Sequence, residues 1–199
     1  MPSDGDQEHL PAELVRAVEL LADTFAARSI RYALVGGLAT LMRGRPRFTQ
    51  DVDVLIDVSQ IALPGLLDEL ARIGFTFDAP TVIREYVREH ITVLRFGEIR
   101  VDWLKPVLPL YTTAITDASS LTWTEGHPIQ VATAEGLIMT KIVAFRPQDQ
   151  ADIETLMVAN RDTIDVDAIR REWAAVSKGE QARTKWLEDA ISRLIQRCL

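Results

Sequence analysis

Two aspartates one residue apart, Asp51 and Asp53, are the residues whose types and spacing most directly indicate chemistry in this 199-residue chain. They alternate with valines, which predicts a β-strand in which both carboxylates share one face, about 7 Å apart at Cα. Such carboxylates repel each other unless a cation lies between them. Mg²⁺ or Mn²⁺, held by carboxylates and by phosphates of a substrate, would meet that need. The alternative is that both aspartates simply face water.

A glycine pair, Gly36-Gly37, precedes Asp51 with thirteen residues between them. It follows an apolar run at 32–35 that predicts a buried strand. Glycines lack a Cβ, so the backbone here can turn sharply and approach a ligand closely. A short helix expected over 38–42 would direct its free N–H groups toward that ligand. The combination favours a ligand site over a water-facing strand.

Positive charge is concentrated between these two motifs, although the chain as a whole has a formal net charge of −7 and a pI near 5.0. An acidic protein with one local basic cluster fits a site for an anionic nucleotide better than a long nucleic-acid-binding surface. The residues concerned are Arg43, Arg45 and Arg47, followed by Thr49.

Several classes of protein and site are excluded by composition. Cys198 is the only cysteine, so no intrachain disulfide can form. The polar N-terminus and the absence of an apolar run near 18 residues predict a cytoplasmic protein with no membrane span. The three histidines lack zinc-site spacing, and there is no Walker A, dinucleotide-binding or nucleophile-elbow motif.

A hairpin is predicted further along the chain, with strands at 91–96 and 99–104 and a turn at Gly97-Glu98. In its second strand Arg100 and Asp102 point to the same face. They could form a surface ion pair, or Asp102 could supply a further carboxylate to a metal site.

Helices are predicted where apolar residues recur at helical spacing. Residues 75–86 are expected to form short strands or a loop because Pro80 breaks the segment, and the pattern over 106–128 is weak. Thr133 is a predicted N-cap of a helix ending at Arg146, before Pro147. Other helices are expected over 11–25, over 63–73, after Asp165, and around 187–198.

Lys141 lies on the mostly apolar helix after Thr133, where sequence alone favours a side chain that snorkels to solvent. Asp149 is expected to be the N-cap of the next helix. Asp152 is expected to pair with Arg146.

The Gly-Gly pair, the thirteen-residue gap and Asp51-Val52-Asp53 resemble the first motif of the polymerase-β-like nucleotidyltransferase superfamily, in particular its AbiEii-type (abortive-infection toxin) branch. The resemblance covers about 11–160 and includes the segment Lys141-x4-Arg146-x2-Asp149-x2-Asp152. Many members carry Gly-Ser where this chain has Gly-Gly, which removes one hydroxyl that could contact phosphate.

The resemblance implies transfer of a nucleoside monophosphate from an NTP to an RNA (tRNA) or protein acceptor, with release of pyrophosphate. A cognate antitoxin or toxin is an implied partner. Asp51, Asp53 and Asp102 would be the catalytic and metal-binding residues for Mg²⁺ or Mn²⁺. The nucleotide-binding residues would be Gly36, Gly37, Arg47, Thr49 and Lys141, and the supporting residues Arg146, Asp149 and Asp152.

The predicted fold class is α/β (α+β): a small mixed sheet flanked by helices, followed by C-terminal helices. The nucleotidyltransferase core would span 10–160, with 161–199 a helical extension of the same compact unit. Alternative functions are an antibiotic-type enzyme that modifies a small molecule, an antitoxin that modifies a partner toxin, and a catalytically silent nucleotide-binding module. The presence of all three carboxylates speaks against the silent module.

Overall fold

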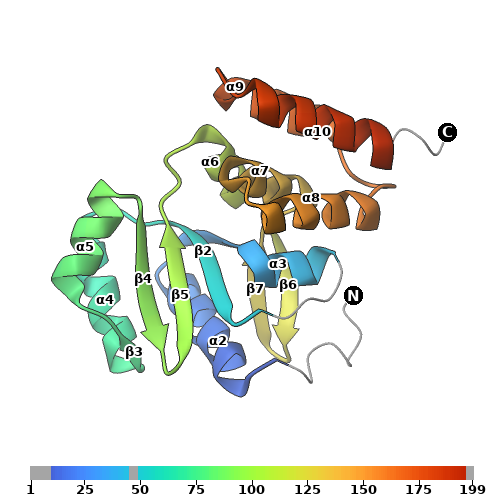
Figure 1. Ribbon diagram of the computed structural model, residues 1–199. Helices are drawn as coiled ribbons and strands as arrows, with labels where there is room; N and C mark the ends of the chain where they lie inside the picture. The colour runs from blue at the N-terminus through green and yellow to red at the C-terminus, as the bar shows by residue number, and fades with distance from the viewer. Residues whose placement is uncertain (1–9, 45–48, 196–199) are drawn as a thin grey trace.

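The computed structural model describes residues 10–44 and 49–195, so that Arg45, Arg47 and Cys198 lie outside the described residues. Within these ranges the chain forms a mixed α/β fold around one open sheet (Figure 1). The predicted fold class is confirmed. The strands follow the order β3-β4-β5-β2-β1-β7-β6 and comprise β1 Arg31–Val35, β2 Asp51–Asp57, β3 Phe75–Thr76, β4 Ile91–Phe96, β5 Ile99–Leu104, β6 Ser119–Thr124 and β7 His127–Val131.

Helices cover both faces of the sheet. In Figure 1, α2 crosses behind the sheet, α3 lies in front of it, and α9 and α10 form an outer layer beyond α7 and α8. None of the described helices is long and apolar enough to span a membrane. The helices are α2 Ala12–Ala27, α3 Gly36–Arg43, α4 Leu63–Arg72, α5 Ala79–Arg88, α6 Pro109–Thr116, α7 Ala134–Ala144, α8 Pro147–Ala159, α9 Val166–Val176 and α10 Gln181–Leu194.

The centre of the sheet separates apolar and charged side chains onto opposite faces. On one face, Val52 and Val54 of β2 and Trp103 of β5 are fully buried. The ring centroids of Trp103 and of Phe25 on α2 lie 6.0 Å apart, so this face forms the main core. Because strand side chains alternate, the aspartates of β2 and β5 must project from the other face.

The segment from residue 75 to 86 is not the loop or set of short strands that the sequence suggested. Only Phe75–Thr76 is a strand, and α5 begins at Ala79. Asp78 caps that helix by accepting a hydrogen bond from the Thr81 backbone N–H (3.0 Å). Pro80 lies in the first turn, where its missing N–H removes no helical hydrogen bond, so it starts the helix and does not break it. The weak region over 106–128 contains α6 and β6.

The helix after Thr133 is capped as predicted, since the Thr133 hydroxyl accepts a hydrogen bond from the Gly136 N–H (3.2 Å). It ends at Ala144, two residues before the predicted Arg146, because Phe145 adopts a left-handed conformation with φ of 53°. Pro147 then begins α8. The lysine of α7 and the aspartates of α8 therefore face one another across a tight turn.

The turn between α7 and α8 is covered by α10. The rings of Phe145 and Trp186 meet edge to face with centroids 5.4 Å apart. The Arg183 guanidinium lies 5.5 Å from the centre of the Phe145 ring and donates a hydrogen bond to the Val143 carbonyl (2.9 Å). Helix α10 therefore packs against the end of α7.

We predict that Leu187→Ala, at a side chain of α10 that is 1% exposed, destabilises the whole protein and not only its C-terminal end. The cavity should cost about 2–5 kcal/mol of the free energy of unfolding. Urea unfolding followed by circular dichroism and by tryptophan fluorescence should give one coincident transition at lower urea. Two separate transitions, with the first confined to the C-terminal helices, would show that 161–199 unfolds on its own.

Candidate active site

A cleft of about 540 Å³ lies over the charged face of β2 and β5, between the start of α3 and the turn joining α7 to α8. It brings together residues that are up to 114 positions apart in the sequence, from Val35 to Asp149. Arg47 is outside the described residues, and Asp152 lies behind Lys141 without lining the cleft. The predicted site residues that line it are Gly36, Gly37, Thr49, Asp51, Asp53, Asp102, Lys141, Arg146 and Asp149.

The carboxylates of Asp53 and Asp102 are neighbours because β2 and β5 pair in parallel, with Asp53 opposite Asp102 and Asp51 opposite Arg100. Burial, together with the negative charge of Asp102, raises the pKa of Asp53 to about 6. A hydrogen bond from the Gly37 backbone N–H partly offsets this shift. The Asp53 carboxyl therefore takes up a proton more readily than an exposed aspartate does.

Arg100 and Asp102 form the predicted ion pair, with 2.8 Å between Arg100 Nε and Asp102 Oδ1. The Arg100 side chain is 46% exposed, whereas that of Asp102 is 16% exposed and lines the cleft. The two interpretations of Asp102 are thus compatible, because one oxygen accepts the guanidinium bond while the carboxylate faces the cleft.

Only glycine fits at position 36, because the backbone there lies against the side chain of Asp53. Its φ is +66°, and a Cβ at this position would lie 1.9 Å from Asp53 Oδ2. Any side chain would displace the carboxylate as well as strain the backbone. The glycine pair therefore positions Asp53, through the space at Gly36 and the N–H of Gly37, a role that sequence reasoning did not foresee.

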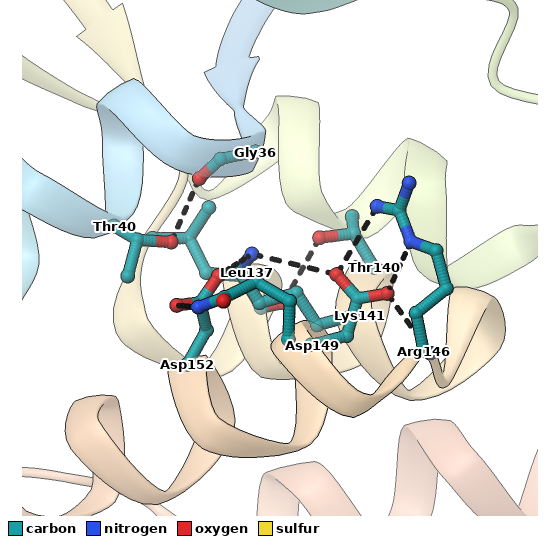
Figure 2. A network of polar contacts seen from close by, with 9 residues as sticks. Gly36, Thr40, Leu137, Thr140, Lys141, Arg146, Asp149 and Asp152 are labelled. Carbon is teal, nitrogen blue, oxygen red and sulfur yellow. Dashed lines mark hydrogen bonds and ion pairs between the residues drawn. The ribbon is translucent and has the colours of Figure 1, made fainter. Parts of the chain in front are cut away.

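Lys141 is buried, with 4% of its surface exposed, so the interpretation that it snorkels to solvent is wrong. Its Nζ lies 2.6 Å from Asp152 Oδ2 and 3.7 Å from Asp149 Oδ1. Figure 2 shows the lysine side chain pointing from α7 toward these two aspartates of α8. Asp152 also accepts a hydrogen bond from Gln148 (3.0 Å), and its negative charge contributes to the raised pKa of Arg146.

Asp149 stands at the third position of α8 and not at its N-cap, which is Arg146. It accepts hydrogen bonds from the Arg146 backbone N–H (3.0 Å) and from Arg146 Nε (2.7 Å). Although burial acts to raise it, these bonds hold the pKa of Asp149 below its usual value. The Arg146 side chain is 75% exposed at the cleft edge, so it can also reach a ligand.

Of the basic cluster between the two motifs, the structure describes Arg43 and the threonine that follows the cluster, Thr49. Arg43 turns away from the cleft and binds backbone carbonyls of Val131 and Ala132 (3.2 Å each) and the Ser119 hydroxyl. It ties α3 to the adjoining strands and has no part in the cleft. Thr49 lines the cleft, with its hydroxyl 3.4 Å from the Asp51 carbonyl.

An apolar wall that sequence reasoning missed completes the cleft. It consists of Leu55, Leu104 and Tyr111. Leu55 and Leu104 are paired across β2 and β5, two positions after Asp53 and Asp102. That i+2 spacing, which puts them on the carboxylate face, is the signal that could have identified them.

Residues 19–197 match the family described as nucleotidyl transferase AbiEii toxin, type IV TA system. The chain belongs to this family. No curated protein sequence matches it. Among solved structures, a nucleotidyltransferase-like antigen from Paracoccidioides brasiliensis is 18% identical, with a TM-score of 0.50, over 90% of this chain and 94% of its own. ANT(2″)-Ia in complex with adenylyl-2″-tobramycin is 15% identical, with a TM-score of 0.51, over 83% and 97%. These two likenesses concern the fold.

The cleft of this AbiEii-family protein fits a divalent cation that is completed by substrate oxygens. Within 10–44 and 49–195, no three His, Cys, Asp or Glu side chains lie close enough to hold a metal by themselves. Mg²⁺ usually takes one or two protein carboxylates plus phosphates and water. Asp53 and Asp102 supply such a pair, in register across β2 and β5.

We predict that Asp53 destabilises the metal-free protein near neutral pH. Its pKa rises from an ordinary value of 3.8 to about 6 on folding, so the native state binds the proton more tightly. The resulting stability is present below pH 4 and is lost as the pH rises through 6, a change on the order of 3 kcal/mol. Urea unfolding in EDTA at pH 5 and pH 7.5 should show about half of this loss in the wild type, because at pH 5 the other half has already occurred. Asp53→Asn should show a smaller loss, whereas identical pH dependence in the two proteins would contradict the assignment.

We predict that Lys141→Met is strongly destabilising, because it leaves the buried carboxylates Asp149 and Asp152 without the lysine charge. The expected cost is about 3–5 kcal/mol of the free energy of unfolding. Adding Asp152→Asn should restore part of the loss, while Lys178→Met on an exposed loop serves as a neutral control. Chemical denaturation measures all three variants. A Lys141→Met protein as stable as the wild type would mean that the buried ion pair is energetically unimportant.

Proposed function

This AbiEii-family nucleotidyltransferase, we propose, transfers a nucleoside monophosphate from an NTP to an RNA or protein acceptor in a reaction that depends on Mg²⁺ or Mn²⁺. The observation that carries the proposal is the in-register pair Asp53 and Asp102, with Asp51 beside it, facing Lys141 across one cleft. Phosphoryl transfer requires carboxylates on one wall of the cleft and positively charged side chains on the other.

The triphosphate would lie between the start of α3 and the turn joining α7 to α8. Arg146 and the Nζ of Lys141 would neutralise its charge, since an ammonium group can rotate to share its three donors between Asp152 and a phosphate oxygen. Thr49 would line the same end, and Arg47 is proposed as a further phosphate contact. At Gly36 and Gly37 the absence of side chains would let the phosphates approach the backbone.

The acceptor hydroxyl would be deprotonated with help from Asp102, whose orientation is held by Arg100. Asp51, Asp53 and Asp102 would hold the divalent cation, which when bound neutralises charge on the phosphates and activates the attacking oxygen. Asp53 is placed by Gly36 and Gly37 so that its carboxylate is ready before the substrate arrives. Most of the rate enhancement would therefore come from positioning and charge stabilisation.

A cytoplasmic role as a toxin–antitoxin component is proposed from the family, whose description names a type IV system. An antitoxin would then be the partner of this chain. The antitoxin alternative, in which the chain modifies a toxin protein, uses the same site with a protein acceptor.

Small-molecule modification is the second candidate function. It is favoured by the similarity in fold to ANT(2″)-Ia, whose structure contains adenylyl-2″-tobramycin. In that case the same carboxylates and the same positively charged side chains would catalyse the transfer, with a different acceptor bound next to Asp102. A silent nucleotide-binding module is a third possibility, which the three carboxylates in the cleft oppose.

We predict that one set of mutations abolishes nucleotide binding, whereas another leaves binding intact and abolishes only transfer. Asp51→Asn combined with Asp53→Asn should abolish metal-dependent binding of a non-hydrolysable NTP in calorimetry. Asp102→Asn should retain that binding but lower transfer by about 10²–10⁴-fold, the usual contribution of a general base. Transfer is measured with each labelled NTP and Mg²⁺ on total RNA, protein and aminoglycoside.

A matched control is Asp57→Asn, which removes a carboxylate on the same strand that pairs with Arg31 away from the cleft. Equal metal-dependent binding by the Asp51→Asn/Asp53→Asn protein and this control would rule out the metal assignment. Transfer at the wild-type rate by Asp102→Asn would remove that residue from the site.

A further inference from the structure

A second cavity, of about 320 Å³, lies between α6, α7 and α9, outside the active cleft. The three helices pack against one another above the sheet (Figure 1). None of the described residues that line this cavity also lines the active cleft. Its volume is near the lower limit for ligand-binding cavities in proteins, so a ligand here would be a small molecule.

The floor of the second cavity is apolar. Leu110 and Ala114 of α6 and Met139 of α7 are each at most 2% exposed, and Ile169 of α9 is fully buried. A polar group placed against these side chains would lose its hydrogen bonds to water without replacing them. The part of a ligand that reaches the floor must therefore be apolar.

The mouth of the second cavity is acidic. Its charged residues are more exposed than those of the floor, and Arg171 is the one basic residue among the described lining residues. A surface of this sign repels nucleotides and other phosphates and attracts cations. The cavity is therefore unsuited to a second NTP. The acidic residues are Asp117, Glu135, Asp165 and Glu172.

The acidic residues of α9 stand at the two ends of one apolar stretch. Asp165, Ala168, Ile169 and Glu172 follow helical spacing, so all four lie on the face that lines the cavity. Asp165 and Glu172 are two helical turns apart, which is about 10 Å along the helix axis. A ligand that satisfies both ends needs two positive charges separated by an apolar chain.

Hydrogen bonds from neighbouring groups hold these carboxylates in place. The Glu172 carboxylate accepts a bond from the Thr113 hydroxyl (3.1 Å). At the other end, Asp165 accepts one from the Ala168 N–H (2.8 Å), and its own backbone N–H donates to Glu135 (2.9 Å). A carboxylate has about four acceptor positions, so each can still bind an ammonium group.

We infer that the second cavity is a binding site for a linear aliphatic diamine or polyamine. One terminal ammonium would lie at Glu172 and the other at Asp165 and Glu135, with the methylene chain along the apolar floor. The inference does not rest on the proposed function, because no residue assigned to the nucleotide or the metal takes part.

The second cavity and the active cleft share two helices. On α6, Leu110 lines the second cavity and Tyr111 lines the cleft. On α7, Met139 lines the second cavity, whereas Thr140 and Lys141 line the cleft. A diamine bound between α6, α7 and α9 would therefore stabilise the helices that form one side of the cleft.

The test is isothermal titration calorimetry of the full-length protein with 1,8-diaminooctane, 1,3-diaminopropane and MgCl₂. The longer diamine is expected to bind about tenfold more tightly than the shorter one, or better, because it buries more methylene groups and can reach both acidic ends. Mg²⁺ carries the same charge without an apolar part, and at equal concentration it should not displace 1,8-diaminooctane.

Four variants test the assigned residues. Asp165→Asn keeps a good N-cap and Glu172→Gln keeps an acceptor for Thr113, and each should weaken 1,8-diaminooctane binding about three- to tenfold. Arg171→Gln should strengthen it about twofold, because the guanidinium lies 3.8 Å from Asp165 and competes with the ammonium. Ala168→Phe should abolish it by filling the cavity.

The matched control is Asp167→Asn, which removes an exposed carboxylate of α9 that pairs with Arg170 and does not line the cavity. It should bind 1,8-diaminooctane within about twofold of the wild type. Thermal melting checks that every variant is folded, and the conservative changes at Asp165 and Glu172 keep the test valid if Ala168→Phe is not.

The inference is overturned if the wild type does not bind 1,8-diaminooctane, or if it binds both diamines and Mg²⁺ equally, as simple charge screening would. Equal affinity in Asp165→Asn, Glu172→Gln and the control would also overturn it. So would loss of diamine binding in Asp51→Asn/Asp53→Asn with none in the α9 variants, because the diamine would then occupy the active cleft. Failure of the proposed function is seen separately, as a wild type that does not bind NTP with Mg²⁺.

Discussion

The site depends on one electrostatic constraint, which is that β2 and β5 hold Asp53 and Asp102 side by side in parallel register. Two carboxylates so placed repel each other, and burial increases the cost because low-dielectric surroundings screen charge poorly. The protein offsets part of that cost with the Gly37 N–H on Asp53 and the Arg100 guanidinium on Asp102. The rest remains as the raised pKa of Asp53, which comes chiefly from burial and also from the charge of Asp102.

The opposite wall of the cleft has the reverse requirement, because a buried lysine needs buried anions. Asp152 and Asp149 meet it, and Arg146 in turn holds Asp149. These residues converge only because Phe145 reverses the chain between α7 and α8 in a left-handed conformation that costs a non-glycine residue on the order of 1 kcal/mol. Contacts from Trp186 and Arg183 support that turn. The C-terminal helix is thus linked to the cleft, which agrees with a family match that extends to residue 197.

The two sides of the cleft also differ in how they are closed. Helices α3, α7 and α8 enclose the side where the glycine pair and Lys141 lie, whereas β4 and β5 leave the other side open to solvent. An enclosed side suits a ligand of constant shape such as a triphosphate. An open side suits an acceptor much larger than the cleft, for which charge and surface complementarity matter more than enclosure.

Local sequence determined much of this protein. The alternation of Asp51-Val52-Asp53, the turn at Gly97 and the Thr133 cap are short-range patterns, and each formed the predicted structure because its physical cause lies within a few residues. The pairing of distant segments was decided by tertiary structure. Whether Lys141 snorkels or is buried depends on α8 presenting Asp152 across a turn, and whether Asp102 is a surface residue depends on β5 adding beside β2. Sequence spacing predicts the face of a helix or strand to which a side chain points. The tertiary structure alone decides which residues pack against that face, because burial and charge at a site depend on all the segments that meet there.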